Sequence, residues 1–275
     1  MSYGFFHIYY FHNNNLLKNR PNGVAMPSGI AVYEVLKIIA GTPLFTEDHI
    51  ERLHNSMKIA GIKDFTISRQ DFSDKVTTLC KENEVYYGNI EICVSESENK
   101  TVDCYIGFIP HKYPKPLDYI EGVSVLLMQA ERKNPNTKVK YTKTRLKANE
   151  FLKKNTVFEA IFENQNGYIT EGSRSNVFFI RDKVAYTSPH EFVLSGITRK
   201  YVIESLKSQN IEVIEKLVQK TDLPYMDAAF LCGTSPGIIP IKQIDDYRFN
   251  VNNTVLRNAI VEYNSYVQQY MALNS

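Results

Sequence analysis

The chain has 275 residues, of which 43% are apolar and 23% charged. This is the composition of an ordinary soluble globular protein, long enough for one large domain or two domains of ordinary size. The net charge of +2 gives no strong electrostatic field that would attract nucleic acid or an anionic membrane. The sequence has no run of about 18 apolar residues, so no membrane-spanning helix is predicted. The four cysteines are scattered and form no C-x-x-C pair, which argues against zinc and disulfides and favours a cytoplasmic protein.

The first part of the chain alternates strands and helices. Residues 29–45 favour strand structure and end at a Gly-Thr-Pro turn. Thr46 is predicted to cap the helix that follows, in which apolar residues recur at helical spacing. A second capped helix is predicted over 68–83, followed by two strands paired around the polar turn 96–100.

The second part of the chain is richer in strands. Four strand-like runs lie between residues 157 and 188, and Asn166-Gly167 predicts a hairpin turn between the first two. Residues 140–155 and 196–210 are predicted to be helical, and a capped amphipathic helix ends the chain.

The order of these elements predicts a mixed α/β (α+β) fold of two domains. Residues 111–122, a segment with two prolines and no periodicity, are predicted to contain the linker. We therefore divide the chain into an N-terminal α/β domain (1–115), a linker (116–122) and a C-terminal domain (123–275). The pattern G-x-G-x-x-G after a first strand, typical of dinucleotide-binding sheets, is absent.

Three features could bind an anion such as a phosphate. In SGITR (195–199), small residues precede a helix whose first N–H groups have no intrahelical partners and favour negative charge. The turn GTSPG (233–237) offers hydroxyls and N–H groups that can form an anion nest. Arg52 would add a permanent positive charge if it faced such a site. Each feature alone is weak, because helix caps, turns and exposed arginines are common.

Glu171 ends a predicted strand among the small polar residues of TEGSRSN (170–176). Small neighbours tolerate a close approach of a ligand, so an ionised carboxylate here could hold a protonated ring nitrogen. In isolation, an exposed glutamate that caps the next turn is the more common interpretation. The residues alone leave both interpretations open.

In chain order these segments resemble the class IV (fold type IV) pyridoxal-phosphate-dependent aminotransferase family, which includes D-amino-acid aminotransferase, branched-chain aminotransferase and 4-amino-4-deoxychorismate lyase. The resemblance covers the chain from about Gly29 to Asp245, and it is carried by FTEDHIERL, FEAIFENQNGYITEGSRSNVFFI, LSGITR and MDAAFLCGTSPGIIPIKQID. It implies the cofactor pyridoxal 5′-phosphate, a homodimer, a smaller N-terminal α/β domain, a larger C-terminal pseudo-barrel domain and an active site between the two domains.

The resemblance also implies roles for individual residues. Glu171 would pair with the pyridine nitrogen and strengthen the ring as an electron sink. Tyr33 would line the substrate pocket next to Glu34, which matches the family's strand acid near the mouth of the active site. The remaining cofactor contacts that the resemblance implies are Arg52, Ile197, Thr198 and Thr234 at the phosphate, and Ser175 and Asn176 beside the cofactor.

The resemblance places the Schiff-base lysine a set distance before the acid of a Glu-Ala strand, here Glu159. That distance selects Lys138, 21 residues earlier, at the end of an R-x-x-P-x-x-K motif that begins at Arg132. Lys140 is the alternative, because the preceding valine makes an apolar-Lys pair like that of the family, and Lys143 is less favoured. The asparagine that relatives carry a few residues after the lysine is missing.

The implied reaction is transamination of an amino acid with a 2-oxo acid, in which the freed lysine acts as general base on the α-proton. The alternative is 4-amino-4-deoxychorismate lyase, which releases pyruvate. A third, less favoured, possibility is an inactive relative that only binds the cofactor. The strand and turn ICVSESENK (92–100) lack the Arg-Gly pair of the shorter relatives, so the amino acid and its enantiomer stay open. We expect small-molecule substrates, no nucleic-acid or membrane partner and no metal.

Overall fold

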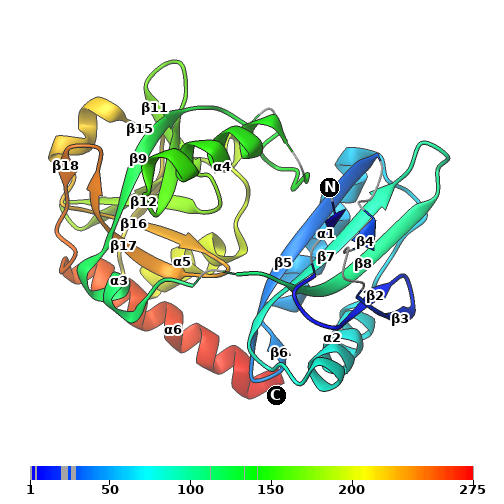
Figure 1. The fold of residues 1–275 in the computed structure, drawn as a ribbon. Helices are drawn as coiled ribbons and strands as arrows, with labels where there is room; N and C mark the ends of the chain where they lie inside the picture. Colours follow the sequence, from blue (N-terminus) through cyan, green and yellow to red (C-terminus); the bar gives the residue numbers. More distant parts are fainter. Residues whose placement is uncertain are drawn as a thin grey trace. The chain divides into compact units, whose positions relative to one another are not determined.

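The chain folds into two compact units (Figure 1). This computed structural model describes residues 2–3, 5–19, 24–25, 29–111, 113–132, 134–140 and 142–274. Unit 1 comprises Met1–Lys112, Thr137–Lys140 and Gln269–Ser275, and unit 2 comprises Tyr113–Asn136 and Tyr141–Gln268. Two short segments from later in the chain thus belong to the N-terminal unit, whereas the sequence suggested a single contiguous division.

Unit 1 is built on a six-stranded sheet with the order β3-β2-β8-β7-β5-β6, in which neighbouring strands are antiparallel. Its strands are β2 (Tyr9–His12), β3 (Asn15–Lys18), β5 (Ile30–Ile39), β6 (Thr42–Pro43), β7 (Gly88–Glu96) and β8 (Val102–Ile109), and the short strands β1 (Ser2–Tyr3) and β4 (Val24–Ala25) pair separately. The predicted pairing of two strands around the turn 96–100 is confirmed by β7 and β8.

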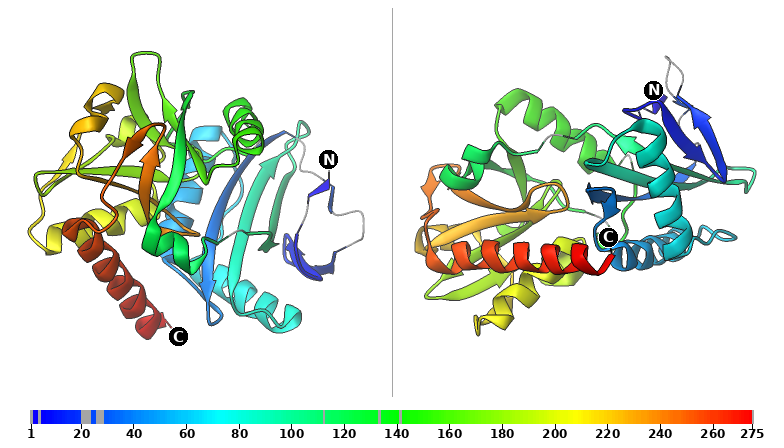
Figure 2. Two further views of the ribbon diagram at one scale, coloured as in Figure 1. Left: turned by 60° about the vertical axis from the view of Figure 1, so that its left-hand side comes forward. Right: turned by 90° about the horizontal axis from the view of Figure 1, so that it is seen from below.

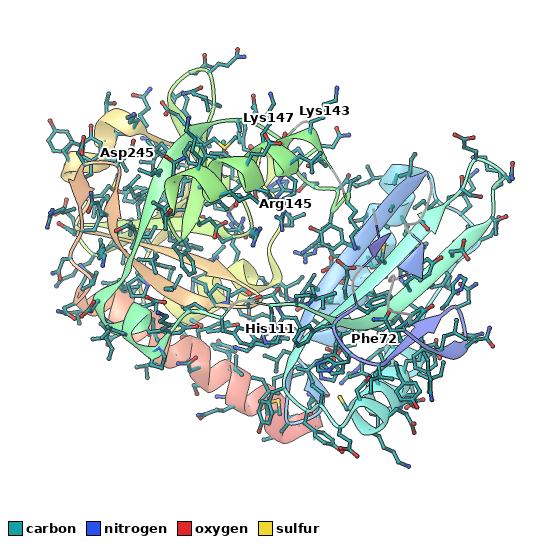
Figure 3. The ribbon with its side chains drawn as sticks, viewed as in Figure 1. Phe72, His111, Lys143, Arg145, Lys147 and Asp245 are labelled. Carbon is teal, nitrogen blue, oxygen red and sulfur yellow. The ribbon has the colours of Figure 1, made fainter. Side chains whose placement is uncertain are left out.

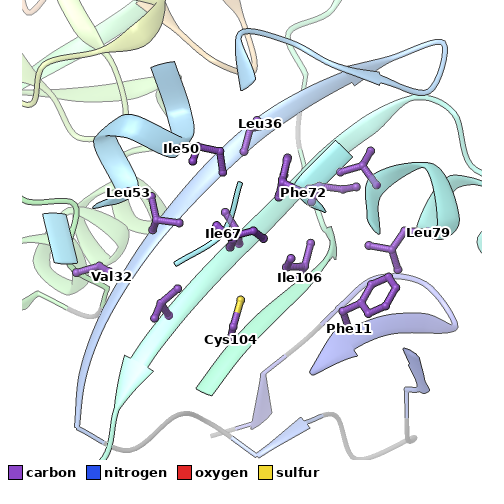
Figure 4. Packing of buried hydrophobic residues seen from close by; sticks show 14 of the residues in the cluster. Phe11, Val32, Leu36, Ile50, Leu53, Ile67, Phe72, Leu79, Cys104 and Ile106 are labelled. Atoms are coloured by element: carbon purple, nitrogen blue, oxygen red, sulfur yellow. The ribbon is translucent and has the colours of Figure 1, made fainter. Parts of the chain in front are cut away.

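The hydrophobic core of unit 1 lies between this sheet and the helices α1 (Thr46–Ala60) and α2 (Arg69–Asn83) (Figure 2). Because strand side chains alternate, β5 directs every second residue, among them Val32 and Leu36, into this core. On the other side of this core lie Ile50 and Leu53 of α1, which recur at the helical spacing predicted from the sequence (Figure 4). Burial of each such side chain contributes about 1.5–3 kcal/mol.

The start of α1 differs from the prediction. Thr46 is the first residue of the helix and does not cap it, because the capping position is Phe45, which has a left-handed backbone (φ 53°) and makes no side-chain cap. The Thr46 hydroxyl donates to the carbonyl oxygen of Pro43 at 3.1 Å instead. In α2 the predicted cap is confirmed, since Ser68 Oγ accepts a hydrogen bond from the N–H of Asp71 at 3.0 Å.

Unit 2 contains a large mixed sheet with the order β14-β13-β12-β16-β17-β9-β10-β11-β15, and β18 pairs with β17. Parallel pairs (β9 with β10, β17 with β9, β13 with β14) interrupt an otherwise antiparallel sheet. The strands are β9 (Val123–Gln129), β10 (Glu159–Glu163), β11 (Tyr168–Gly172), β12 (Asn176–Arg181), β13 (Val184–Thr187), β14 (Val213–Glu215), β15 (Val218–Gln219), β16 (Ala228–Gly233), β17 (Gly237–Ile244) and β18 (Tyr247–Arg248). The four strands expected between 157 and 188 are therefore confirmed as β10–β13.

The helices of unit 2 are α3 (Pro116–Glu121), α4 (Lys143–Asn155), α5 (Ile197–Ser208), most of α6 (Thr254–Asn274) and the short 3-10 turns η1 (His190–Phe192) and η2 (Lys220–Tyr225). They differ from the predictions at the linker, at the start of α4 and at the two short 3-10 turns, which were not predicted. The segment predicted to be an irregular linker contains α3, and a proline occupies the first position of this helix. The helix expected from residue 140 begins at Lys143, because Thr142 Oγ1 accepts from the N–H of Arg145 and caps it there. Among the described residues, no helix combines the length and apolar character needed to cross a membrane.

Candidate active site

The residues predicted to form the site fall into two groups, one in each unit. Tyr33, Arg52, Lys138 and Lys140 belong to unit 1, and the acid, turn and helix-start residues from Glu171 to Thr234 belong to unit 2. Within each unit, the structure shows which of these side chains meet.

Glu34 is the centre of the group in unit 1. It lies on β5 with no exposed surface, among the side chains that face α1. His49 and Arg52 stand one helical turn apart on α1 and both reach its carboxylate. The distances are 2.8 Å from His49 Nδ1 to Oε2, 2.6 Å from Arg52 Nε to Oε1 and 2.7 Å from Arg52 Nη2 to Oε2. Arg52 is therefore buried and bound to a carboxylate, and the exposed position common for an arginine is excluded.

Lys138 completes this charged group. Its Nζ lies 3.7 Å from Glu34 Oε2. Burial alone would raise the pKa of Glu34, but the charges of Arg52 and Lys138 and the hydrogen bonds from Arg52 and His49 outweigh it and hold that pKa well below its usual range. Burial lowers the pKa of His49, against the opposing effect of Glu34. An ionised carboxylate, a neutral imidazole and two cations therefore share one buried position.

The backbone around Lys138 explains how the lysine reaches this place. Residues 137–140 run antiparallel along the edge of β5, through a bridge between Val139 and Val32. Tyr33 N donates to the Lys138 carbonyl at 3.1 Å, and Lys140 N donates to the Ala31 carbonyl at 2.9 Å. Because side chains alternate along an extended segment, Lys138 and Lys140 lie on one side of it and Val139 on the other.

Tyr33 lies beside both candidate lysines. The Nζ atoms of Lys138 and Lys140 are 5.4 and 5.5 Å from the centroid of its ring, within the range of a cation–π contact. Lys140 also forms an ion pair with Glu91 on β7. Lys143 is different, because it is an exposed residue of α4. Figure 3 shows it on the same side of that helix as Lys147 and opposite Arg145.

Glu171 is the centre of the group in unit 2. It lies near the end of β11 and is only 2% exposed, so it is not the exposed turn cap that is common for an isolated glutamate. Arg132 Nε donates to its Oε1 at 2.5 Å, and the N–H of Leu194 donates to its Oε2 at 3.1 Å. Burial raises the pKa of Glu171, and Arg132 and the Leu194 N–H oppose this effect. Arg132 entered the sequence argument only as part of a motif, and its contact with Glu171 was not predicted.

A second buried acid, Glu159 on β10, holds the turn that follows Glu171. Its Oε1 accepts hydrogen bonds from Ser173 Oγ at 3.3 Å and from the backbone N–H of Arg174. Burial raises its pKa. Gly172 allows this packing, because a Cβ there would lie 2.2 Å from Ser175 Oγ and 2.8 Å from Glu159 Oε1. From the sequence, Glu159 was assigned no role beyond marking the distance to the lysine. An acid in an otherwise apolar strand nevertheless suggests a hydrogen-bond partner for its carboxylate.

Asn176, the first residue of β12, links Glu171 to the start of α5. Its Nδ2 donates to the carbonyl oxygen of Leu194 at 3.0 Å. The backbone N–H of Leu194 donates in turn to Glu171. Gly196 caps α5, and a Cβ on it would lie 2.0 Å from Asn176 Oδ1, so only glycine leaves room for this close approach. Because Gly196 has no side chain, it cannot accept hydrogen bonds from the first N–H groups of α5. These N–H groups belong to the buried residues Ile197 and Thr198.

Thr234 lies in the hairpin between β16 and β17, where Gly233 pairs with Gly237. Asn176 is the register partner of Cys232 in β16, which brings the end of β16 beside the turn after Glu171. Ser175 in that turn has a buried hydroxyl that makes no hydrogen bond with the residues that the structure describes. Unit 2 therefore gathers Glu171, the turn 173–176, the start of α5 and the hairpin of Thr234 at one edge of its sheet.

This edge offers what a phosphorylated ring compound requires. A buried carboxylate can face a ring N–H, and unpaired helix N–H groups and hydroxyls can face a phosphate. The profile of the family described as Amino-transferase class IV matches residues 31–244 of this chain. The chain belongs to the class IV aminotransferase family.

Curated relatives of the chain include both transferases and a lyase. It is 29% identical over 232 residues to the D-alanine aminotransferase of Bacillus licheniformis, covering 79% of this chain and 80% of that protein. It is 27% identical over 243 residues to the branched-chain-amino-acid aminotransferase of Escherichia coli strain K12, with 81% and 77% covered. It is 25% identical over 239 residues to the aminodeoxychorismate lyase of Bacillus subtilis, with 80% of each covered.

The fold agrees with this membership. The branched-chain amino acid aminotransferase of Escherichia coli superposes with a TM-score of 0.83 at 22% identity, covering 95% of each chain. The branched-chain aminotransferase of Thermoproteus uzoniensis, determined with norvaline, superposes with a TM-score of 0.82 at 23% identity, covering 96% of each. The fold is thus the two-domain mixed α/β fold type IV that the resemblance implied, and this class IV aminotransferase homologue is an enzyme.

Proposed function

We propose that this enzyme is a pyridoxal 5′-phosphate-dependent transaminase that uses Lys138 to bind the cofactor covalently and exchanges an amino group between an amino acid and a 2-oxo acid. The observation that carries the proposal is the environment of Lys138, whose ammonium lies beside Glu34 and over the ring of Tyr33. Two of the three curated relatives described above point the same way, because the D-alanine and branched-chain relatives are aminotransferases.

The residues of unit 2 fit the cofactor. Glu171 has two carboxylate oxygens with four lone-pair positions, so Arg132 and Leu194 leave capacity for a ring N–H. The first N–H groups of α5, from Ile197 and Thr198, have no side-chain cap. The buried hydroxyl of Ser175 without a hydrogen-bond partner among the described residues is a further group that a polar ligand would satisfy.

Arg52 and Thr234 complete the proposed phosphate contacts. In the structure the Arg52 guanidinium binds Glu34 through Nε and Nη2. A guanidinium has five N–H donors, so a phosphate contact would add to this ion pair without replacing it. Thr234 and the backbone of its hairpin would contribute a hydroxyl and N–H groups. We propose that Glu34 fixes the direction of Arg52 and thereby the place of the charge.

Bound pyridoxal phosphate supplies an electron sink for the charge that remains when the α-proton leaves the substrate. Glu171 would pair with the ring nitrogen, and Arg132 would oppose the rise in the pKa of Glu171 that burial causes. Lys138, displaced by the substrate amine, would take the α-proton as general base and return it to the neighbouring carbon. Glu34 would hold the Lys138 amine in reach during both transfers.

The covalent role of Lys138 is tested by borohydride reduction of the purified protein, followed by peptide mass spectrometry. We expect a visible absorbance band that reduction abolishes and a tag on Lys138. Lys138→Ala should lose the band and lower turnover by a factor of about 10²–10⁴. Lys140→Ala is the matched control, since it removes the neighbouring lysine and should keep the band. A tag on Lys140, or an unchanged spectrum in Lys138→Ala, would contradict the assignment.

A second candidate function is 4-amino-4-deoxychorismate lyase, favoured by the relative from Bacillus subtilis. Each reaction has its own product. The transaminase should convert 2-oxoglutarate to glutamate when supplied with an amino donor from a panel of D- and L-amino acids. Release of pyruvate from aminodeoxychorismate without any 2-oxo acid acceptor would replace our proposal with the lyase.

We further propose that the enzyme is a cytoplasmic homodimer. Phe6 and Ile8 near the start of the chain are each 61% exposed, and Ile30 is 52% exposed. Large apolar side chains exposed to this degree favour burial against a second copy. Light scattering coupled to size-exclusion chromatography should give twice the mass of the chain, and a monomer at micromolar concentration would contradict the proposal.

A further inference from the structure

The outer face of the unit 1 sheet contains an ion pair that the reaction described above does not use. Along β7, Ile90, Ile92 and Val94 point into the core between sheet and helices. The residues that alternate with them face the other way, yet Asn89, Glu91 and Ser95 are each at most 5% exposed. Polar groups are thus buried on a face where apolar side chains would cost less.

Lys140 is the partner of the charged member of this row. Its ammonium forms an ion pair with Glu91, and the Lys140 side chain is 14% exposed. Buried ion pairs add little stability over apolar residues of the same size, because both charges lose their hydration. Stability therefore gives no reason for this ion pair, so its role depends on its position in the fold.

That place is beside the reactive lysine. Lys138 and Lys140 are two residues apart on an extended segment, and both ammonium groups contact the Tyr33 ring. When an amino acid gives its amino group to the cofactor, its carboxylate is the remaining charged handle, and it needs a cation within a few ångströms. Among the described residues of unit 1, the other two basic groups that contact Glu34 beside Lys138 are His49 and Arg52, which are hydrogen-bonded to its carboxylate on the core side.

We propose that Lys140 binds the carboxylate of the amino-acid substrate and that Glu91 holds Lys140 in place for this contact. The inference rests on the proposed function and names its substrate class: α-amino acids with a free carboxylate, in preference to simple primary amines. Lys140 is then a specificity-determining residue, and Glu91 and Tyr33 are positioning residues. Lys138 is then the lysine that reacts with the cofactor, and Lys140 is the lysine that binds the substrate carboxylate.

The test is a single-turnover measurement of the loss of the visible band. Wild type, Lys140→Met and Lys140→Arg are mixed with the amino acid that reacts fastest in the D- and L-panel. Each is also mixed with the matched amine, in which a methyl group replaces the carboxylate. Lys140→Met should raise the half-saturating amino-acid concentration about 10- to 100-fold, with a smaller change in the limiting rate, while the rate with the amine stays within twofold. Lys140→Arg should restore most of the lost affinity.

Glu91 provides the second variant. Lys140→Met leaves Glu91 buried without its cation, so the double variant Lys140→Met/Glu91→Gln removes both charges and should fold while showing the same loss of amino-acid affinity. Glu91→Gln alone should weaken amino-acid binding less than Lys140→Met does.

The outcomes separate this inference from the proposed function. An unchanged half-saturating concentration in both Lys140 variants, with the band intact, would overturn the carboxylate role and leave Lys138 as the reactive lysine. If borohydride tags no lysine in wild type, or tags Lys140, the proposed function itself is wrong and the inference is overturned with it. Equal losses with the amino acid and the amine would overturn it as well, because the effect would then not depend on the carboxylate.

Discussion

Glu34 in unit 1 and Glu171 in unit 2 are both buried glutamates at strand positions, yet their electrostatic surroundings are opposite. Glu34 has Arg52, Lys138 and His49 around it, and its pKa is held well below the usual range. Glu171 has one cation, Arg132, and a backbone N–H, and its pKa is raised. Burial acts in the same direction on both, so the number of cations within reach decides the sign.

The comparison indicates two different tasks. The Glu34 carboxylate stays ionised over any ordinary pH and can organise cations around it. Glu171 is poised closer to protonation, which suits an acid that would share a proton with a ring nitrogen. If this is right, the two carboxylates should respond differently to neutralisation and to pH.

The largest expected effect is the loss of the Glu34 charge. Glu34→Gln leaves Arg52 and Lys138 in a buried place without their anion, and breaking a buried ion pair on one side costs about 3–5 kcal/mol. The measurement is urea unfolding at pH 7. Glu47→Gln is the matched control in the same unit, because Glu47 pairs with Arg69 at the surface and both side chains are over 40% exposed. Its cost should be about 0–1 kcal/mol, and equal costs for the two variants would remove the basis of the comparison.

A smaller effect is expected for Glu171→Gln. Glutamine resembles the neutral carboxyl group that burial favours, and Arg132, whose side chain is 18% exposed, keeps access to water. The unfolding free energy should fall by about 1–2 kcal/mol. A loss as large as that of Glu34→Gln would show that Glu171 also acts mainly as a buried counter-ion.

The smallest effects are the slopes of stability with pH. Burial raises the folded pKa of Glu171 above its usual value of 4.5, so its contribution to stability is complete below that pH and is lost as pH rises. The stability deficit of Glu171→Gln relative to wild type should therefore become smaller as pH rises above 4.5. The folded pKa of Glu34 is depressed from the same value, so its contribution is lost as pH falls below 4.5. Each slope is limited to about 1.4 kcal/mol per pH unit. Parallel curves for the variants and wild type from pH 3 to 8 would contradict both signs.

Local patterns in the sequence determined most of the secondary structure. The apolar spacing of α1, the Ser68 cap, the strands β7 and β8 and the glycine at the entrance of α5 depend on neighbours within a few residues, which the sequence displays directly. The error at the start of α1 arose from adjacent residues, because a neighbour of Thr46 takes the capping position. Thr46 lost its capping role because Phe45 takes a left-handed backbone and the Thr46 hydroxyl turns to Pro43.

The sequence by itself also determined the family, because its motifs keep their order over most of the chain. It predicts, through that resemblance, the roles of the acid Glu171 and of the lysines Lys138 and Lys140. Only the tertiary structure decided which charges meet. The pairs Glu34–Arg52, Arg132–Glu171 and Lys140–Glu91 join residues 18, 39 and 49 positions apart. Nothing local specifies such partners, since strand pairing and helix packing bring them together, and burial then makes each pairing energetically necessary.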